Sequence, residues 1–360
     1  MGKARSKGTN KVAESKNSGV RNITAQEMRD LAFGAGITVP IEQTWTWYDF
    51  EDSFSDRELV GFYSVLEEGE PVAVLALMKT DYHGFDFLWS KNGPVWLVEP
   101  TEKRERWLVD LLVRWIKDRS SRIAFVRLHL LYPGKNAHDP VQIISHDRTV
   151  VVQLDPDPEK ILAGFSKKGR ASVRRSIRRD PVEIVDETTQ ATADFAPYFE
   201  LMEETGDRQG FTHWDKDVYE GMLRGLTEDH ARVFAARREG RLVGWSVVTI
   251  AGPSASYYYA ASNKEGRECR APEQLVFGAA SRLGAQGIKT LDLVGIGSDR
   301  APSLRGLTPF KTKFAAEVTE VAPAYDIPVN KALYRVLMSL RHGKKRIEGL
   351  TSRLQRAKED

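Results

Sequence analysis

Basic side chains gather in one short stretch of the sequence. This stretch contains Lys160, Lys167, Lys168, Arg170, Arg174, Arg175, Arg178 and Arg179, with no acidic residue among them. Such a block favours binding of polyanions, for example RNA, anionic lipid headgroups or phosphorylated ligands. The alternative is a solvated helix face, but such a face usually carries acidic partners for its cations. We therefore expect this stretch to bind a polyanion.

A second group of residues forms a pattern that could hold a substrate. Residues 257–262 have a strand-like sequence, and a helix-like run opens at Pro272 and stops at Gly287. A short apolar strand follows at residues 290–294. A glycine-rich loop then leads to the segment 309–314. Strand, helix, strand and loop form one α/β unit whose strand ends could bind a small molecule.

The segment 309–314 contains the lysine that is the main catalytic candidate. Alternation from Phe310 to Phe314 predicts a strand with both phenylalanines on one face and Lys311 and Lys313 on the other. The alternative interpretation is a half-exposed strand with two solvent lysines.

Composition limits the classes of protein to consider. The chain has 360 residues, 41% of them hydrophobic and 29% charged, and a net charge of +3, which is typical of a soluble globular protein. Its length allows two domains, each with its own core. The single Cys269 excludes an internal disulfide framework, and no Cys/His cluster has zinc-ligand spacing. We expect neither a metal nor a cofactor.

The two halves of the chain repeat one layout. Paired strands surround Glu68-Gly69 in the first half and Glu239-Gly240 in the second, each within a Glu-Gly-x-x-Val pattern. Strands are expected at 59–65, 72–79, 86–89, 124–130 and 150–154, and then at 182–186, 231–237 and 242–250. Helices are expected at 25–33, 102–117, 193–205 and 215–226. The fold class is α/β (α+β), with related domains at 23–155 and 181–328.

The basic stretch lies in a connector, residues 156–180, between these domains. Asp157 can cap a first helix and Ser166 a second. In the second helix, Arg170, Arg174 and Arg178 share one row, while Val173 and Ile177 form an apolar seam. The connector should thus pack by its seam and expose an arginine ridge.

Both ends of the chain are basic. Residues 1–22 are polar and should form a disordered tail rather than a secretory signal, and no stretch is apolar enough to span a bilayer, so a cytoplasmic location is expected. Residues 329–360 should form a helix in which Leu333, Leu337 and Leu340 are spaced for packing. This helix carries Arg341, Lys344, Lys345, Arg346, Arg353 and Arg356. It could bind peripherally to anionic lipids.

In their order, these elements resemble the Fem family (FemABX) of peptidyltransferases over residues 43–313. The resemblance rests on Gln43 with nearby tryptophans, Gly93-Pro94-Val95, the basic helix from Lys168 to Arg179, Thr205-x-x-Arg208-x-x-Phe211, Tyr258-Tyr259-Ala260-Ala261-Ser262, Asp292-Leu293-Val294-Gly295-Ile296 and Leu307-x-x-Phe310-Lys311. The family joins amino acids from aminoacyl-tRNA to the stem peptide of peptidoglycan precursors. The resemblance implies two tandem domains like those of GNAT acyltransferases, of the FemX-like type that lacks a coiled-coil arm.

The resemblance also implies roles for individual residues. The amine of the stem peptide attacks the ester of aminoacyl-tRNA, and Lys311, in the Phe310-Lys311 motif, stabilises the resulting oxyanion. The implied substrate-binding residues are Arg208, Tyr258, Tyr259, Gln43 and Trp47. Because Tyr258 and Tyr259 should point to opposite faces, at most one of them is expected to reach the site. The implied tRNA contacts are Lys167, Lys168, Arg170, Arg174, Arg175 and Arg178.

One position departs from the family's pattern, and two rival functions stay open. Several members have a lysine, which binds precursor phosphate, where this chain has Phe50. The first rival is a GNAT-type N-acyltransferase that uses acyl-CoA. Its pyrophosphate loop would lie at 263–272, a stretch with one glycine, two acids and a proline at the helix start. The second rival is a non-catalytic RNA- or membrane-binding protein, against which Lys311 and Arg208 argue mildly.

Overall fold

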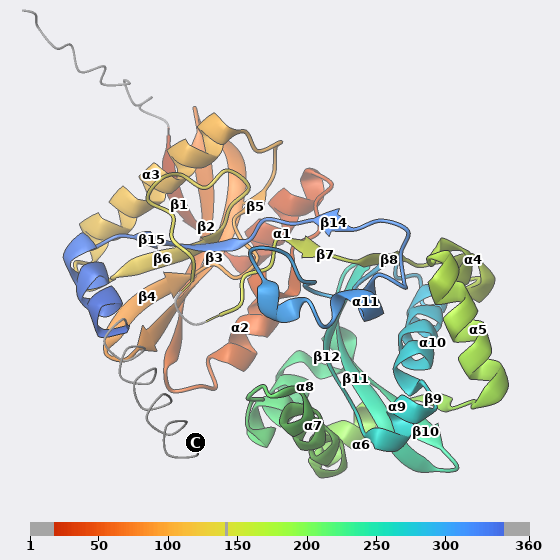
Figure 1. Cartoon of the computed structure of the whole chain (residues 1–360). Helices are drawn as coiled ribbons and strands as arrows, with labels where there is room; N and C mark the ends of the chain where they lie inside the picture. The colour runs from red at the N-terminus through yellow and green to blue at the C-terminus, as the bar shows by residue number, and fades with distance from the viewer. Residues whose placement is uncertain (1–17, 141–142, 342–360) are drawn as a thin grey trace, which may run out of the picture.

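Two mixed β-sheets and a two-stranded ribbon between them form the frame of the computed structural model, which describes residues 18–140 and 143–341 (Figure 1). The first sheet has the order β1-β2-β3-β4-β6-β15, with β5 paired to β3. Its strands are β1 (Gly19–Ile23), β2 (Arg57–Glu67), β3 (Glu70–Tyr82), β4 (Phe85–Trp89), β5 (Val95–Trp96), β6 (Phe125–His129) and β15 (Ala324–Pro328). The expected mixed α/β architecture is confirmed.

The second sheet has the order β8-β13-β12-β11-β10-β9. Its strands are β8 (Val151–Gln153), β9 (Glu183–Asp186), β10 (Ala231–Arg238), β11 (Arg241–Ala251), β12 (Ser254–Ser262) and β13 (Thr290–Asp292), and the ribbon pairs β7 (Arg148–Thr149) with β14 (Thr319–Glu320). Between β12 and β13 the pairing is parallel, as expected for a strand–helix–strand unit.

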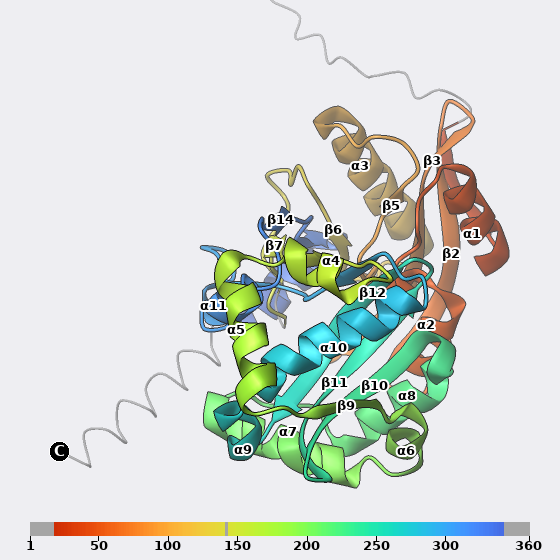
Figure 2. The same ribbon diagram turned by 90° about the vertical axis from the view of Figure 1, so that its right-hand side faces the viewer.

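Helices cover both faces of both sheets (Figure 2). In the first half these are α1 (Ala25–Gly34), α2 (Trp45–Glu51), α3 (Glu102–Arg119) and a helix over residues 331–341. In the second half, α4 (Pro158–Gly164), α5 (Lys167–Arg179) and α10 (Ala271–Ala285) pack on one face, and α6 (Thr188–Ala193), α7 (Ala196–Gln209) and α8 (Lys216–His230) pack on the other. Short helical turns are α9 (Lys264–Glu268), α11 (Thr308–Lys311), Ile41–Gln43 and Pro302–Leu304.

Local sequence signals place these elements as predicted. Thr24 and Glu27 form a reciprocal capping box at the start of α1. Asp157 caps α4, and the Ser166 hydroxyl accepts from the backbone N–H of Gly169 at the start of α5. Both Glu-Gly turns have positive φ at both residues, which is the geometry of a tight two-residue hairpin turn.

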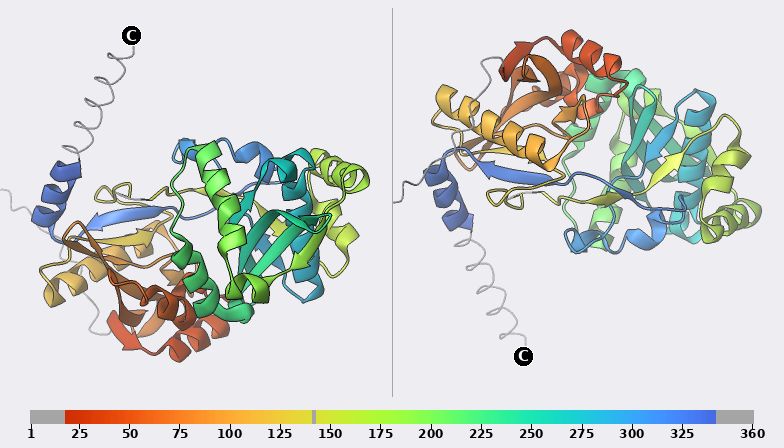
Figure 3. Two further views of the ribbon diagram at one scale, coloured as in Figure 1. Left: turned by 90° about the horizontal axis from the view of Figure 1, so that it is seen from below. Right: turned by 90° about the horizontal axis from the view of Figure 1, so that it is seen from above.

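The domain boundaries predicted at residues 155 and 328 do not separate the two sheets. Strand β8, expected in the first domain, pairs with β13 in the second sheet. Strand β15, expected in the second domain, pairs with β6 in the first sheet, as the blue strand in Figure 3 shows. Each sheet therefore contains one strand from the half of the sequence that otherwise forms the other sheet. The two segments that cross between the sheets pair with each other as the ribbon of β7 and β14.

Two further predictions were wrong in part. Residues 19–22, expected in a disordered tail, form the edge strand β1, because pairing with β2 needs only the backbone. The seam of α5 is narrower than expected: Val173 is buried but Ile177 is exposed, and the small Gly169, Ser172 and Ser176 form the remaining contact face.

The segment 309–314 was predicted to be a strand, and this prediction was wrong. It contains the end of α11 and a turn, so strand alternation does not apply to Lys311 and Lys313.

The helix at the C-terminal end begins as predicted. Leu333 and Leu337 pack on the first sheet, but Leu340 is exposed. The basic residues expected after Arg341 lie outside the described residues. Among the described residues, no helix is long and apolar enough to cross a membrane.

Candidate functional site

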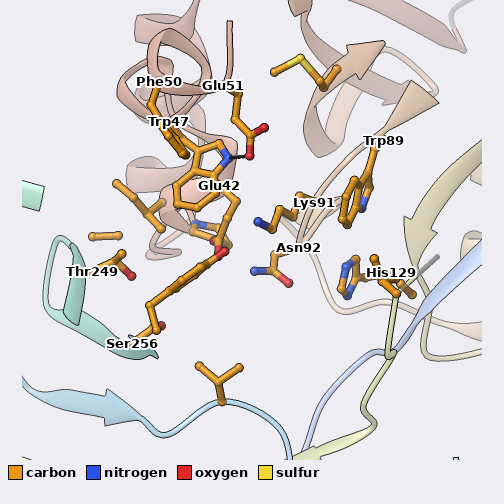
Figure 4. A pocket seen from close by; sticks show the side chains of 18 of the residues that line it. Glu42, Trp47, Phe50, Glu51, Trp89, Lys91, Asn92, His129, Thr249 and Ser256 are labelled. Atoms are coloured by element: carbon orange, nitrogen blue, oxygen red, sulfur yellow. Dashed lines mark hydrogen bonds between the residues drawn. The ribbon is translucent and has the colours of Figure 1, made fainter. Parts of the chain in front are cut away.

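A cavity of about 980 Å³ lies between the two halves of the molecule (Figure 4). Its walls come from α2, from the loop after β4, from segments at residues 143–146 and 321–324, and from β12 and β13. Because both halves line it, their packing determines its shape. A largely apolar cavity with a few polar groups at a junction of two halves is the usual setting of a ligand site.

Tyr258 and Tyr259 both line this cavity, so the prediction that at most one would reach it was wrong. The reason is a β-bulge in β12. Val247 pairs with Tyr259 and Val248 with Tyr257, which leaves Tyr258 as an extra residue. A bulge interrupts the alternation of side chains and can place neighbouring residues on one face. A bulge of this kind cannot be read from the tyrosine run alone.

Trp47 lines the cavity and contacts a lysine that the sequence did not single out. The Nζ atom of Lys91 lies 4.3 Å from the ring centre of Trp47, 5.4 Å from that of Tyr258 and 5.7 Å from that of Trp89. Burial lowers the pKa of Lys91, while Glu51 and Glu42 oppose this effect. The only available signal in the sequence was its position two residues before Gly93.

Gln43 does not reach the cavity, although it was expected to bind substrate. Its side chain is buried, donates to the backbone carbonyl of Lys91 at 2.6 Å and accepts from the N–H of Ala76 at 2.7 Å. A Cβ atom at Gly93 would lie only 3.0 Å from the Gln43 oxygen and 2.3 Å from the Ser90 hydroxyl. Gln43 thus positions the loop that carries Lys91, and Gly93 allows that close approach.

Phe50 takes part in the contact between the two halves. It is buried, and it packs against Gly221 and Gly225 of α8, where an added Cβ would lie 3.7 and 2.8 Å from Phe50 atoms. A lysine in its place would bury its charge against a helix. Cavity-lining cations near this end are Lys91 and Arg57.

Lys311 lies behind the cavity wall formed by β13 and the residues after it. Its ammonium donates to the backbone carbonyls of Val294 and Gly295, the latter at 2.9 Å, and Val294 itself lines the cavity. Burial lowers the pKa of Lys311 to about 8, although the carboxylate of Asp292 opposes the shift. The structure therefore places an easily deprotonated ammonium next to the cleft.

The backbone that Lys311 contacts is strained. Val294 has φ of +56°, a conformation that β-branched residues rarely adopt. Asp292 stabilises it by accepting from the Val294 N–H at 2.7 Å and from the hydroxyl of Thr149. These contacts give Asp292 a structural role.

His146 completes this part of the wall. An added Cβ at Gly295 would lie 2.8 Å from its ring, so the imidazole lies close against the segment that Lys311 holds. Burial lowers the pKa of His146. No group of three or more His, Cys, Asp or Glu side chains among the described residues is placed to bind a metal.

The other lysine of the segment is not a solvent lysine. Lys313 donates to Glu273 at 2.8 Å, and Phe310 packs against the core of the second half rather than facing the cavity. Arg208 is exposed in the last turn of α7 and does not line the cavity. Its helix contacts Ser262, the end of β12 farthest from the cavity-lining Ser254 and Ser256.

The basic helix α5 contacts the segment that carries Lys311. The N–H and the hydroxyl of Ser166 both donate to the backbone carbonyl of Lys313, at 3.0 and 3.1 Å. Of the expected RNA contacts, Lys167, Lys168, Arg174, Arg175 and Arg178 are exposed. Arg170 instead donates to carbonyls at the end of α4, and Arg174 pairs with Glu159, so the expected ridge is only partly available.

Replacement of Gly169 by alanine should destabilise the protein. The new Cβ would lie 1.9 Å from the carbonyl oxygen of Lys313, and overpacking of this kind costs about 1–3 kcal/mol. Gly164→Ala is the matched control, because no atom lies within 4 Å of its added Cβ. Urea denaturation should show a lower midpoint for Gly169→Ala alone. Equal midpoints for both variants would show that α5 is not tightly docked here.

Comparison with known proteins identifies relatives of this fold. Residues 165–312 match the family model described as acetyltransferase (GNAT) domain. A stretch of 107 residues, 30% of this chain, is 26% identical to UDP-N-acetylmuramoylpentapeptide-lysine N(6)-alanyltransferase of Weissella viridescens. That match spans only 31% of the relative's length.

Solved structures extend the likeness to nearly the whole chain. A crystal structure of FemX superposes with a TM-score of 0.68 at 16% identity, covering 88% of this chain and 99% of FemX. A tandem GNAT protein from the clavulanic acid biosynthesis pathway superposes with a TM-score of 0.50 at 13% identity, covering 87% of this chain and 98% of that protein. These superpositions confirm a FemX-like, tandem GNAT-like fold.

Proposed function

We propose that this protein is an aminoacyltransferase that joins an amino acid from aminoacyl-tRNA to the side-chain amine of a peptidoglycan stem peptide. The observation that carries the proposal is the contact between α5 and Lys313. Through it, an exposed basic helix lies beside the segment that holds Lys311 at the cavity wall. The named alanyltransferase relative and the FemX-like fold support the same reaction class.

The reaction is aminolysis of an ester. The neutral amine of the acceptor attacks the ester carbonyl, whose oxygen becomes negative in the tetrahedral intermediate. Collapse of the intermediate forms the amide and releases the ribose hydroxyl of the tRNA, while the amine loses a proton. The ester is already activated, so the protein must chiefly orient the amine and stabilise the oxyanion. Lys311 supplies the positive charge for this task.

The exposed cations of α5 provide the surface for the tRNA. Phosphate contacts give affinity without reading sequence and make binding fall with salt. The acceptor occupies the cavity between the halves, where Trp47, Tyr258 and Tyr259 offer aromatic surface. A cytoplasmic location belongs to this proposal, since aminoacyl-tRNA is cytoplasmic. We also propose peripheral membrane contact through the C-terminal basic residues.

The rival that uses acyl-CoA is disfavoured by the start of α10. A pyrophosphate would need free backbone N–H groups there, but Pro272 has none. The carboxylate of Glu273 occupies this first turn, and Lys313 and Ser172 already donate to it at 2.8 and 3.4 Å. A pyrophosphate at the start of α10 would therefore meet the buried carboxylate of Glu273 instead of a set of free backbone N–H groups.

Removal of positive charge from α5 tests the role of the tRNA. The triple variant Lys168→Gln, Arg175→Gln, Arg178→Gln should bind aminoacyl-tRNA more weakly. The slope of its plot of log affinity against log salt concentration should decrease in magnitude by roughly 2–3, which is about 0.7–0.9 for each lost phosphate contact. The control replaces Lys103, Lys117 and Arg122, three exposed cations at or near α3. A similar loss in both variants would indicate a general charge effect and contradict the assignment.

The direct test of the function is transfer of label. Purified protein is mixed with a pool of radiolabelled aminoacyl-tRNAs and with nucleotide-linked or lipid-linked muropeptide. Label that reaches the muropeptide and disappears after ribonuclease treatment is the expected result, and it identifies the amino acid. Turnover with acetyl-CoA without transfer from any tRNA would favour the rival enzyme.

A further inference from the structure

One corner of the cavity holds polar atoms that form no hydrogen bond with the described residues. Lys91 and Asn92 enter it from the loop after β4, and His129 faces it from β6 (Figure 4). The Nε2 atom of His129 and the indole Nε1 atom of Trp89 are buried without a hydrogen-bond partner. Buried polar atoms in a folded protein are nearly always satisfied, by protein, water or a ligand. This corner is therefore built to receive a polar group.

His129 is fixed as a hydrogen-bond acceptor. Its Nδ1 atom lies 2.9 Å from the backbone carbonyl of Ala322, which can only accept, so Nδ1 carries the proton. Burial lowers the pKa of His129 to about 4, so the ring stays neutral near pH 7. The unpartnered Nε2 consequently presents a lone pair, which calls for an N–H or O–H from a ligand.

Lys91 is the cationic donor of the same corner. Its ammonium contacts the rings of Trp47, Tyr258 and Trp89 but forms no hydrogen bond or ion pair with any described residue.

The two nearest carboxylates do not neutralise Lys91 directly. Glu51 already binds the Arg57 guanidinium and the Trp47 indole N–H, and Glu42 interacts with the hydroxyl of Tyr258. A half-buried ammonium in this setting gains most from an anionic oxygen atom.

We propose that this corner is an anion subsite for the acceptor, in which Lys91 and Asn92 donate to a carboxylate or phosphate and His129 accepts from a neighbouring N–H. The inference rests on the proposed function, because a stem peptide provides a carboxylate next to peptide N–H groups, whereas its carrier provides phosphate. The peptide carboxylate suits the corner better, since it supplies both the anion and the N–H that His129 needs.

Gln43 and Gly93 act on this subsite indirectly. The hydrogen bond of 2.6 Å from Gln43 to the Lys91 carbonyl fixes the backbone from which both donors project. Asn92 has φ of +55°, a conformation that asparagine tolerates better than most residues. Both donors therefore depend on one short, tightly held loop.

Calorimetric titration of the full chain tests the subsite without tRNA or transfer. The probes are a lysine-containing tripeptide with a free C-terminal carboxylate, the same tripeptide as its C-terminal amide, and inorganic pyrophosphate. The variants are Lys91→Met, Asn92→Gly, which tolerates the backbone conformation, and the control Lys79→Met. Lys79 also lies in the first sheet but pairs with Glu58 and does not line the cavity.

The free-acid tripeptide should bind the natural chain, and Lys91→Met should weaken it about 10- to 100-fold, as expected for loss of one charge-assisted hydrogen bond. Asn92→Gly should weaken it several-fold, and Lys79→Met should leave it unchanged. A tripeptide amide that binds more weakly identifies the carboxylate as the ligand. Pyrophosphate binding that Lys91→Met abolishes would assign the same subsite to the carrier's phosphate.

Two results would overturn the inference: no binding of either anion, or equal binding by Lys91→Met and the natural chain. The result of the binding titration can be distinguished from the result of the transfer assay. If the anion binds through Lys91 but no amino acid is ever transferred, the subsite stands and the proposed function fails. If transfer occurs with unchanged rates in Lys91→Met, the function stands and the subsite fails.

Discussion

Replacement of Lys311 by methionine should lower the rate of amino-acid transfer about 100- to 1,000-fold. Removal of one group that stabilises an oxyanion costs on this order in other acyl-transfer enzymes. Methionine keeps the length and apolar stem of the side chain, so Val294 and Gly295 lose only the ammonium that their carbonyls accept from. Single-turnover transfer from labelled aminoacyl-tRNA measures the effect.

The matched control is Lys289→Met, which removes an exposed lysine from the same half. It should transfer at the natural rate and unfold near the natural temperature. A rate for Lys311→Met within threefold of the natural rate would exclude an electrostatic role for Lys311.

The same lysine should impose a falling limb on the pH profile. Its pKa is lowered to about 8, so the ammonium that stabilises the oxyanion is present below pH 8 and is lost as the pH rises through that value. An ordinary lysine would stay charged for about two pH units more. The rate constant kcat/KM, which reports the free enzyme, should fall with a midpoint near pH 8. In Lys311→Arg this limb should move to much higher pH.

Replacement of Asp326 by asparagine should lower the free energy of unfolding by about 3–5 kcal/mol, the usual cost of breaking a buried ion pair from one side. Asp326 accepts from Arg127 through both of its oxygens, at 2.6 and 3.1 Å, and both side chains are fully buried. Asparagine has nearly the same shape but no charge, so the buried Arg127 guanidinium loses the negative charge of Asp326. Urea denaturation monitored by tryptophan fluorescence measures the change.

The control for this prediction is Asp155→Asn. Asp155 pairs with Lys160 at 3.5 Å, but that pair is largely exposed, so its loss should leave the denaturation midpoint nearly unchanged. A double variant that replaces Arg127 and Asp326 by apolar residues of similar size should recover much of the lost stability. A loss below 1 kcal/mol in Asp326→Asn would show that the pair is not critical.

Elements governed by local physics could be predicted from the sequence. The caps at Asp157 and Ser166 and the two Glu-Gly turns need only neighbouring residues, and the structure has them as predicted. Features that depend on distant segments could not be predicted. The extra residue Tyr258 is visible only in the register against β11, and the short helix α11 replaces a predicted strand because the segment packs between the core and α5.

The candidate site likewise contains residues that the sequence could indicate and residues that it could not. Trp47, Tyr258 and Tyr259, which short motifs marked as substrate-binding candidates, line the cavity. These motifs could not distinguish a residue in the cavity from one that supports it, which is why Gln43 was assigned to substrate. Lys91 was missed because a single lysine before a Gly-Pro turn resembles any surface lysine. Its environment of three rings comes from three separate elements.

The exchange of strands between the two sheets has a consequence for synthesis on the ribosome. Strand β6 ends at residue 129, but its partner β15 begins at residue 324, and the carboxylate that pairs with Arg127 is on that late strand. The first half therefore cannot complete its sheet as it leaves the ribosome, although domains usually fold in order of synthesis. Until nearly the whole chain has emerged, the apolar edge of β6 stays unpaired. The side chain of Arg127, which is buried in the folded protein, stays exposed to solvent. Nascent chains stopped before residue 324 should accordingly depend on chaperones, and those stopped after residue 341 should not.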